Sequence, residues 1–121
     1  MDVQKLNEVP AFLTKDGSEI RELLAPRNSL IRNQSLAEAR LPVGTSTQEH
    51  FHPRAEEIYF ILAGLGHMEI DGQVTSVSPG DAIAIPPGSV HQIRATGGAE
   101  LRFLCCCAPA YEHDDTILVA E

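Results

Sequence analysis

The sequence of 121 residues has no tryptophan, only two lysines and no apolar run near the length of about 20 residues that crosses a lipid bilayer. Acidic residues outnumber basic ones by 17 to 9, which gives a formal charge of −8. Nucleic-acid binding depends on clustered Lys and Arg, so we expect no nucleic-acid partner. Because no apolar run is long enough to cross a bilayer, we also expect no membrane partner. Residues 1–10 also lack the basic start and apolar centre of a signal peptide, and we therefore predict a cytoplasmic protein.

Cysteine is confined to one run of three, Cys105 to Cys107. A disulfide framework or a zinc ribbon needs separated cysteines, usually in pairs, and consecutive cysteines do not fit either. On a strand, Cys105 and Cys107 would point to one face and Cys106 to the other. We interpret all three as reduced, small core residues without a redox or metal role.

Short apolar and β-branched runs separated by Gly and Pro make up most of the chain, and this pattern is typical of an all-β protein. The tightest turn is predicted at Asp71-Gly72, while residues 3–13 are too irregular to assign. The predicted strands cover residues 19–24, 35–41, 48–52, 57–62, 67–70, 74–77, 82–85, 90–95, 101–107 and 116–119. About ten short strands predict a sandwich or barrel, and the length predicts one domain, residues 1–121. Such a domain buries roughly two-thirds of its unfolded surface, so its core needs no structural metal.

Three of the five histidines fall where they could share an ion: His50 and His52 as a His-x-His pair, and His91 after a Pro-Pro-Gly turn. On a strand, residues i and i+2 point to the same face, roughly 6 to 7 Å apart at the backbone. Glu57 begins the next apolar run and could bring a carboxylate to the same ion. These donors suit divalent Fe, Mn, Ni, Co, Cu or Zn, and four protein ligands in an octahedral site leave two open positions.

A single histidine is more often an ordinary surface or core residue than a ligand, and the hypothesis depends on the combination. His67 and His113 fit no metal-binding pattern, and we expect both to be exposed to solvent. Alternation along the strand places Tyr59 on the same face as Glu57. Tyr59 is therefore a candidate catalytic or ligand-orienting residue, although an aromatic side chain on an inner barrel face is more often core.

Two motifs resemble those of the cupin superfamily, in particular its small single-domain members. The first, G-x5-H-x-H-x3,4-E-x6-G, is matched by Gly44, His50, His52, Glu57 and Gly64, with four residues between His52 and Glu57. The second, G-x5-P-x-G-x2-H-x3-N, is matched by Gly80, Pro86, Gly88 and His91. Its final Asn is replaced by Ala95, which puts local structure or a substrate contact in doubt more than metal binding.

The resemblance implies a double-stranded β-helix, or jelly-roll barrel, with its core at about residues 35–107. It also implies that His50, His52, Glu57 and His91 are the metal ligands. A jelly roll leaves edge strands, which cupins commonly cover by pairing subunits, so we expect a homodimer. We expect the terminal segments, residues 3–24 and 111–120, to form that interface, because the metal site does not need them.

Function is less constrained, because this fold carries many activities. We predict a metal-dependent oxidoreductase, dioxygenase-like, acting on a small organic molecule. One alternative is an isomerase or lyase in which the metal is a Lewis acid. A sugar phosphate fits that reading poorly, because no Lys or Arg cluster surrounds the motifs. Another alternative is a non-catalytic module that binds a small ligand. We expect no attached DNA-binding domain, since the barrel takes up the 121 residues.

Overall fold

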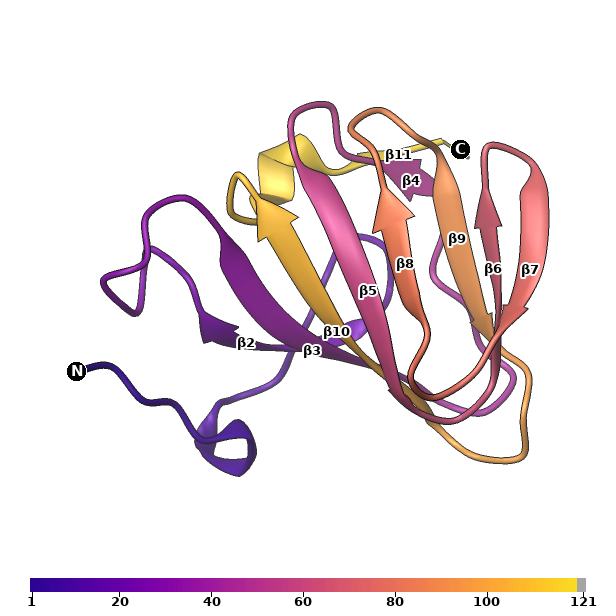
Figure 1. Cartoon of the computed structure of the whole chain (residues 1–121), viewed down its shortest axis with the longest axis horizontal. Coiled ribbons are helices and arrows are strands. Elements are labelled where there is room, and N and C mark those ends of the chain that lie inside the picture. Colours follow the sequence, from indigo (N-terminus) through magenta and orange to yellow (C-terminus); the bar gives the residue numbers. More distant parts are fainter. Residues whose placement is uncertain (120–121) are drawn as a thin grey trace.

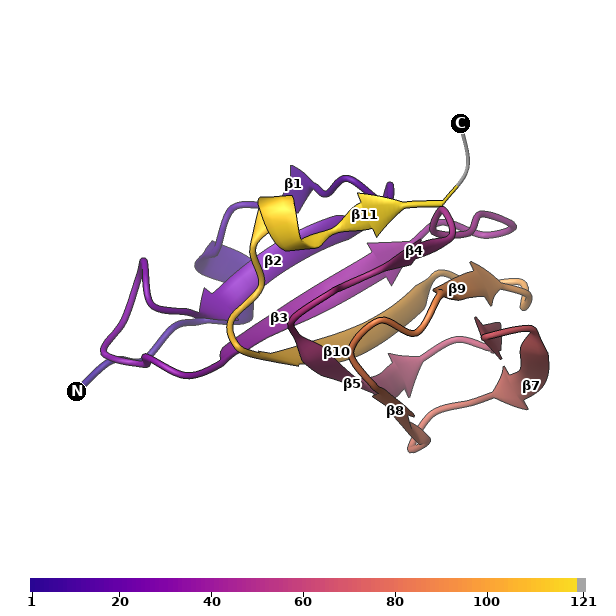
Figure 2. The same ribbon diagram turned by 90° about the horizontal axis from the view of Figure 1, so that it is seen from above.

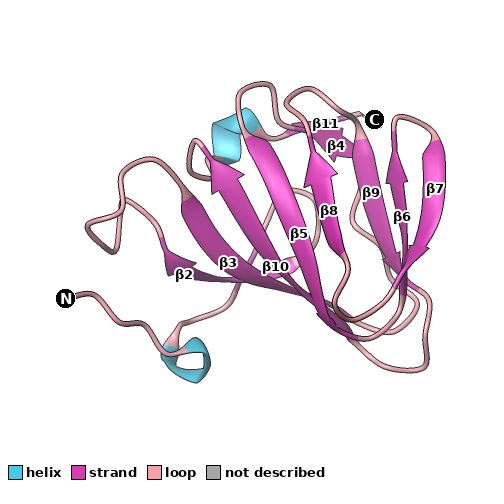
Figure 3. Cartoon of the chain, in the orientation of Figure 1, coloured by secondary structure: helices cyan, strands magenta, loops and turns pink. Residues whose placement is uncertain are grey.

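The structure is a computed structural model that describes residues 1–119, and its regular elements are strands with two short 3-10 turns (Figures 1 and 3). The turns are η1 (Leu6–Glu8) and η2 (His113–Asp115). The strands are β1 (Phe12–Leu13), β2 (Glu19–Leu24), β3 (Ser35–Leu41), β4 (His50–Phe51), β5 (Glu56–Ala63), β6 (Gly66–Ile70), β7 (Gln73–Val77), β8 (Ala82–Ile85), β9 (His91–Ala95), β10 (Leu101–Ala108) and β11 (Ile117–Leu118). No helix within residues 1–119 has the length and hydropathy to span a membrane.

The strands form two antiparallel sheets, and this arrangement confirms the predicted jelly roll. One sheet has the order β1-β2-β3-β10-β5-β8 and the other the order β11-β4-β9-β6-β7. Figure 2 shows β3, β10, β5 and β8 along one wall, with β4, β9 and β7 along the other. Neighbours in a sheet are often distant in sequence: β10 lies between β3 and β5. The first motif is therefore divided between the sheets, with His50 and Glu57 on opposite walls.

Strand alternation builds the core between the sheets. In β10 every second residue is buried, and in β5 the inward positions include Tyr59 and Ile61. Burying such side chains stabilises the fold by about 25 cal/mol per Å² of apolar surface. Ala95, which stands where the second motif has Asn, is 1% exposed and belongs to this core. A small apolar side chain packs at that position.

Gly72 and Gly64 each occupy a turn whose backbone conformation or close packing requires glycine. Asp71 and Gly72 both have positive φ, 48° and 86°, in the loop that joins β6 to β7, and this confirms the predicted tight turn. Gly64, the last member of the first motif, has φ +85°, and a Cβ there would lie 2.5 Å from the carbonyl oxygen of Glu100. A larger residue at Gly64 would separate the end of β5 from the start of β10.

Each predicted strand is present, with ends that agree within two residues. The largest difference is at residues 48–52, where only His50 and Phe51 are strand, so His52 lies just past the strand end. The unassigned residues 3–13 hold η1 and β1. Of the proposed interface segment 111–120, Ala120 lies outside the described residues.

Candidate metal centre

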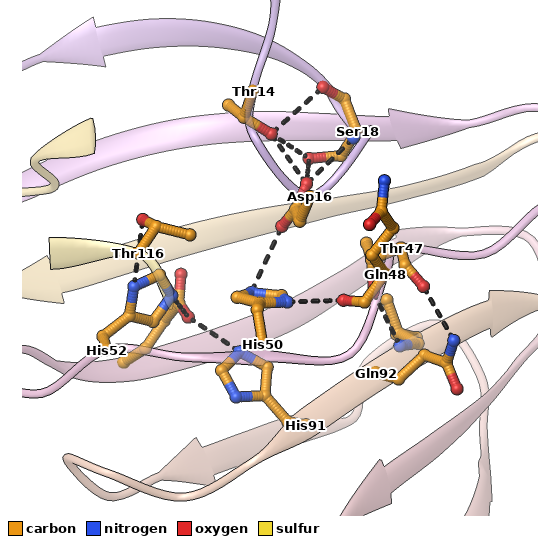
Figure 4. A network of polar contacts seen from close by, with 12 residues as sticks. Thr14, Asp16, Ser18, Thr47, Gln48, His50, His52, His91, Gln92 and Thr116 are labelled. Carbon is orange, nitrogen blue, oxygen red and sulfur yellow. Dashed lines mark hydrogen bonds and ion pairs between the residues drawn. The ribbon is translucent and has the colours of Figure 1, made fainter. Parts of the chain in front are cut away.

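His50, His52 and His91 lie close together in the interior of the barrel (Figure 4). His50 in β4 is the direct partner of His91 in β9. The ring centroids are 4.2 Å apart for His50 and His91, and 5.1 Å apart for His50 and His52. One nitrogen from each ring lies within 4.8 Å of the others, and all three residues are buried. The structure thus brings together the three histidines that the sequence singled out.

Backbone carbonyls fix the orientation of all three imidazoles. His50 Nδ1 lies 2.7 Å from the carbonyl oxygen of Gln48, and His91 Nδ1 lies 2.9 Å from that of Ser89. His52 Nδ1 lies 3.1 Å from the carbonyl oxygen of Asp115. A carbonyl only accepts, so each Nδ1 donates, and each Nε2 is left to face the common centre. Metal-binding histidines are held in this way by hydrogen bonds on the other ring nitrogen.

Glu57 supplies a carboxylate from the opposite sheet. Its Oε1 atom lies 3.3 Å from His52 Nε2 and 3.5 Å from His91 Nε2. Neither Glu57 Oε1 nor His91 Nε2 has a hydrogen-bond partner among residues 1–119, although both atoms are buried. A buried polar atom without a partner is costly. A divalent cation held between these atoms would satisfy both, so the residues fit a metal ion.

Burial and the neighbouring groups shift the pKa values of Glu57 and of His50 and His52 in different directions. Burial alone would raise the pKa of Glu57, but the neighbouring imidazoles of His52 and His91 lower it to about 2. Burial lowers the pKa of His50. Burial also acts to lower the pKa of His52, but Glu57 outweighs it and the pKa of His52 is raised. A proton on His52 Nε2 therefore competes with a metal ion for the same place, and metal binding releases that proton.

Cys107 contacts the other oxygen of Glu57. Its Sγ donates to Glu57 Oε2 over 3.2 Å, and burial raises the pKa of this thiol, which keeps it protonated. Cys105 and Cys107 face inward and Cys106 outward, as the alternation predicted. The interpretation of all three cysteines as mere core residues is nevertheless incomplete, because Cys107 holds Glu57 with Oε1 toward the histidines. The contact follows from the register of β10 on β5, which pairs Cys107 with Glu57.

A cavity of about 30 Å³ adjoins the site, large enough for one or two water molecules. Tyr59 points inward as predicted, with its ring centroid 6.0 Å from that of His91. Tyr111, which the sequence did not single out, lies 6.3 Å from His52 between ring centroids. Its buried hydroxyl has no hydrogen-bond partner within residues 1–119. The lining residues are Thr14, Asp16, Ser18, Ile20, Glu22, Ser35, Ala37, His52, Glu57, Tyr59, Phe103, Cys105, Cys107 and Tyr111.

The two remaining histidines stand apart from this centre. His67 and His113 are both exposed to solvent, as expected. His67 lies on β6, and His113 opens η2. Neither belongs to the buried cluster.

Comparison with known proteins agrees with this geometry. Residues 37–107 match the family model of the cupin domain. An uncharacterised protein of Methanocaldococcus jannaschii is 47% identical over 110 residues, 91% of this chain and 88% of that protein. The oxalate-binding protein of Thermotoga maritima is 33% identical over 86 residues, 71% of each chain. The polyketide cyclase RemF of Streptomyces resistomycificus superposes with a TM-score of 0.84 at 24% identity, over 100% of this chain and 87% of that one.

The chain belongs to the cupin family. The match covers the part of the chain that holds both sheets' central strands and the three clustered histidines. Any function of this chain therefore has to be compatible with the cupin fold and with a centre of three histidines suited to a metal ion.

Proposed function

We propose that His50, His52, Glu57 and His91 bind one divalent transition metal, Fe, Mn, Ni, Co, Cu or Zn. We further propose that the protein is a metal-dependent oxidoreductase, dioxygenase-like, acting on a small organic molecule. The observation that carries the proposal is the buried cluster of three histidines, whose ligand atoms lie within 4.8 Å of one another, with the unpaired Glu57 Oε1 beside His52 and His91. When bound, a redox-active ion would supply electron transfer to dioxygen and would polarise a substrate oxygen.

Residues that line the cavity beside the metal centre would donate hydrogen bonds to a ligand and limit the access of water. Burial raises the pKa of Tyr59 well above its usual value, so its hydroxyl stays protonated and can donate to a ligand. Tyr111 brings a second hydroxyl to the same cavity. Apolar side chains such as Phe103 line the remainder and limit the access of water. No Lys or Arg of residues 1–119 lines the cavity, which favours a substrate without a phosphate.

Oxygen consumption tests the oxidoreductase. We expect protein reconstituted anaerobically with Fe(II) or Mn(II) to consume dioxygen with at least one member of a panel of small phenols, diketones and thiols. Tyr59→Phe is expected to slow that reaction, because it removes the donor while keeping the ring in the core. Metal-free protein is the control. If Fe, Mn and Cu forms consume no oxygen across the panel, the oxygenase is abandoned in favour of a Lewis-acid isomerase or lyase, or a binding module.

The binding module is the second candidate, and the similarity to an oxalate-binding protein favours it. A small dicarboxylate offers two oxygen donors, which suits two adjacent open positions on an ion held by four ligands. Binding without turnover in the oxygen assay would support this candidate.

We also propose that residues 1–121 form one cupin domain with its barrel at about 35–107, and that two copies form a homodimer. The outer face of β5 supports a dimer, because Ile58, Phe60 and Leu62 are 38–49% exposed there, in one row. This row is an interface candidate in addition to the terminal segments. A cytoplasmic location and the lack of a nucleic-acid partner also stay predictions.

The dimer is checked by light scattering. We expect a mass close to twice the 13.1 kDa of the chain. Phe60→Glu should shift it toward the monomer if the row on β5 is buried in the dimer, because a carboxylate in an apolar contact is costly. A wild-type mass of one chain at micromolar concentration would contradict the dimer.

A further inference from the structure

Asp16 reaches the centre from outside the barrel strands. It lies in the turn between β1 and β2, before the residues that match the family model, and neither motif includes it. It is nevertheless only 9% exposed. Its Oδ2 atom lies 3.2 Å from His50 Nε2, the nitrogen that faces the centre (Figure 4).

The turn fixes the direction of this carboxylate. Oδ1 accepts hydrogen bonds from Thr14 Oγ1 at 2.7 Å, from Ser18 Oγ at 2.7 Å and from the Ser18 backbone N–H at 2.9 Å. The backbone N–H of Gln48 donates to the carbonyl oxygen of Asp16 over 2.8 Å, which ties the turn to the segment before β4. With Oδ1 so occupied, Oδ2 is the oxygen left for the centre.

The contact between Asp16 and His50 lacks an evident donor. His50 Nδ1 donates to the Gln48 carbonyl, so the neutral ring presents a lone pair on Nε2 to the lone pairs of Asp16 Oδ2. Glu57 Oε1 and His91 Nε2 face each other in the same way at 3.5 Å. A cation between such atoms turns repulsion into attraction. Adjacent ligands with bonds of about 2.1 Å are about 3 Å apart in an octahedral site, close to these separations.

Glu22 is another carboxylate in this cavity, but its charge is balanced by an arginine and it faces no histidine of residues 1–119. Glu22 also lines the cavity and is 7% exposed, but its Oε1 accepts from Arg27 Nε. Asp16 has no Arg or Lys among its contacts within residues 1–119. The two acids thus differ in what balances their charge.

We propose that Asp16 Oδ2 is a fifth protein ligand of the metal that His50, His52, Glu57 and His91 bind, an inference that rests on the proposed metal site. Two carboxylates then balance the two charges of the ion. The resting octahedral site has one exchangeable position instead of two. A substrate with two donor atoms has to replace Asp16 Oδ2, so Asp16 sets which ligands enter.

Manganese binding tests the proposal without an activity assay. We expect Asp16→Asn, which keeps an oxygen for Thr14 and Ser18, to weaken Mn(II) binding in calorimetry by at least about 10-fold to 100-fold, because the loss of a residue that only orients a ligand already costs that much. Water-proton relaxation of the Mn(II) form should count one exchangeable water in the wild type and two in Asp16→Ala. Glu22→Gln is the matched control and should leave both quantities unchanged.

The outcomes separate this inference from the proposed function. Wild-type protein that binds no divalent metal overturns both. Wild-type binding with an affinity and a water count that Asp16→Asn and Asp16→Ala leave unaltered overturns the fifth ligand alone. In that case Asp16 is only an ion-pair partner of a protonated His50, and the melting temperature of the metal-free variants should fall. Circular dichroism of each variant shows that the barrel is intact.

Discussion

His52→Ala and His91→Ala are each expected to reduce metal content from about one ion per chain to a small fraction. Each substitution removes an Nε2 that a backbone carbonyl orients toward the centre. A chelate loses affinity steeply when one ligand is removed, here by more than about 100-fold, because the loss of an oriented partner alone costs 10-fold to 100-fold. Elemental analysis after reconstitution and gel filtration measures the content.

His67→Ala is the matched control, because His67 is exposed and stands apart from the cluster. The same chemical change there should leave metal content unaltered. We expect the barrel to persist in the metal-depleted variants, since the core of residues such as Ile61 and Phe103 lies between the sheets without the histidines. Circular dichroism that collapses together with metal loss would show a structural ion. Unaltered occupancy in both variants would refute the site.

The sequence was sufficient for the strands because local signals mark them. β2, β3 and β8 have the predicted ends, where apolar runs stop at turn residues such as Pro86 or Pro42. Strand alternation also predicted the His-x-His pair, and the structure brings both rings into one cluster although β4 ends at Phe51, before His52. The positions of Glu57 in the first motif and of His91 in the second then predicted that both residues join this pair.

Three contributors to the site were out of reach, because each depends on packing between distant segments. Cys107 meets Glu57 through the register of β10 on β5, fifty residues apart in sequence. Tyr111 approaches His52 because the chain after β10 crosses from one sheet to the other, where β11 pairs with β4. Asp16 reaches His50 through a turn that precedes the first motif. Periodicity within a segment carries no information about such contacts.

An anaerobic Fe(II) sample treated with nitric oxide is expected to give the high-spin iron-nitrosyl resonance. Nitric oxide is a surrogate for dioxygen and needs one exchangeable position, which both a four-ligand and a five-ligand site retain. Electron paramagnetic resonance detects the product. Glu57→Gln should shift or weaken the signal, because it replaces an anionic donor whose Oε1 lies beside His52 and His91 with a neutral amide.

Glu56→Gln separates this effect from a general change of charge. Glu56 precedes Glu57 on β5 but is exposed, so its substitution removes the same charge from the chain and leaves the centre untouched. We expect its nitrosyl spectrum to match that of the wild type. Iron-loaded wild-type protein that gives no nitrosyl signal has no exchangeable position on the ion, and the oxidoreductase is then abandoned, because dioxygen would have no place to react.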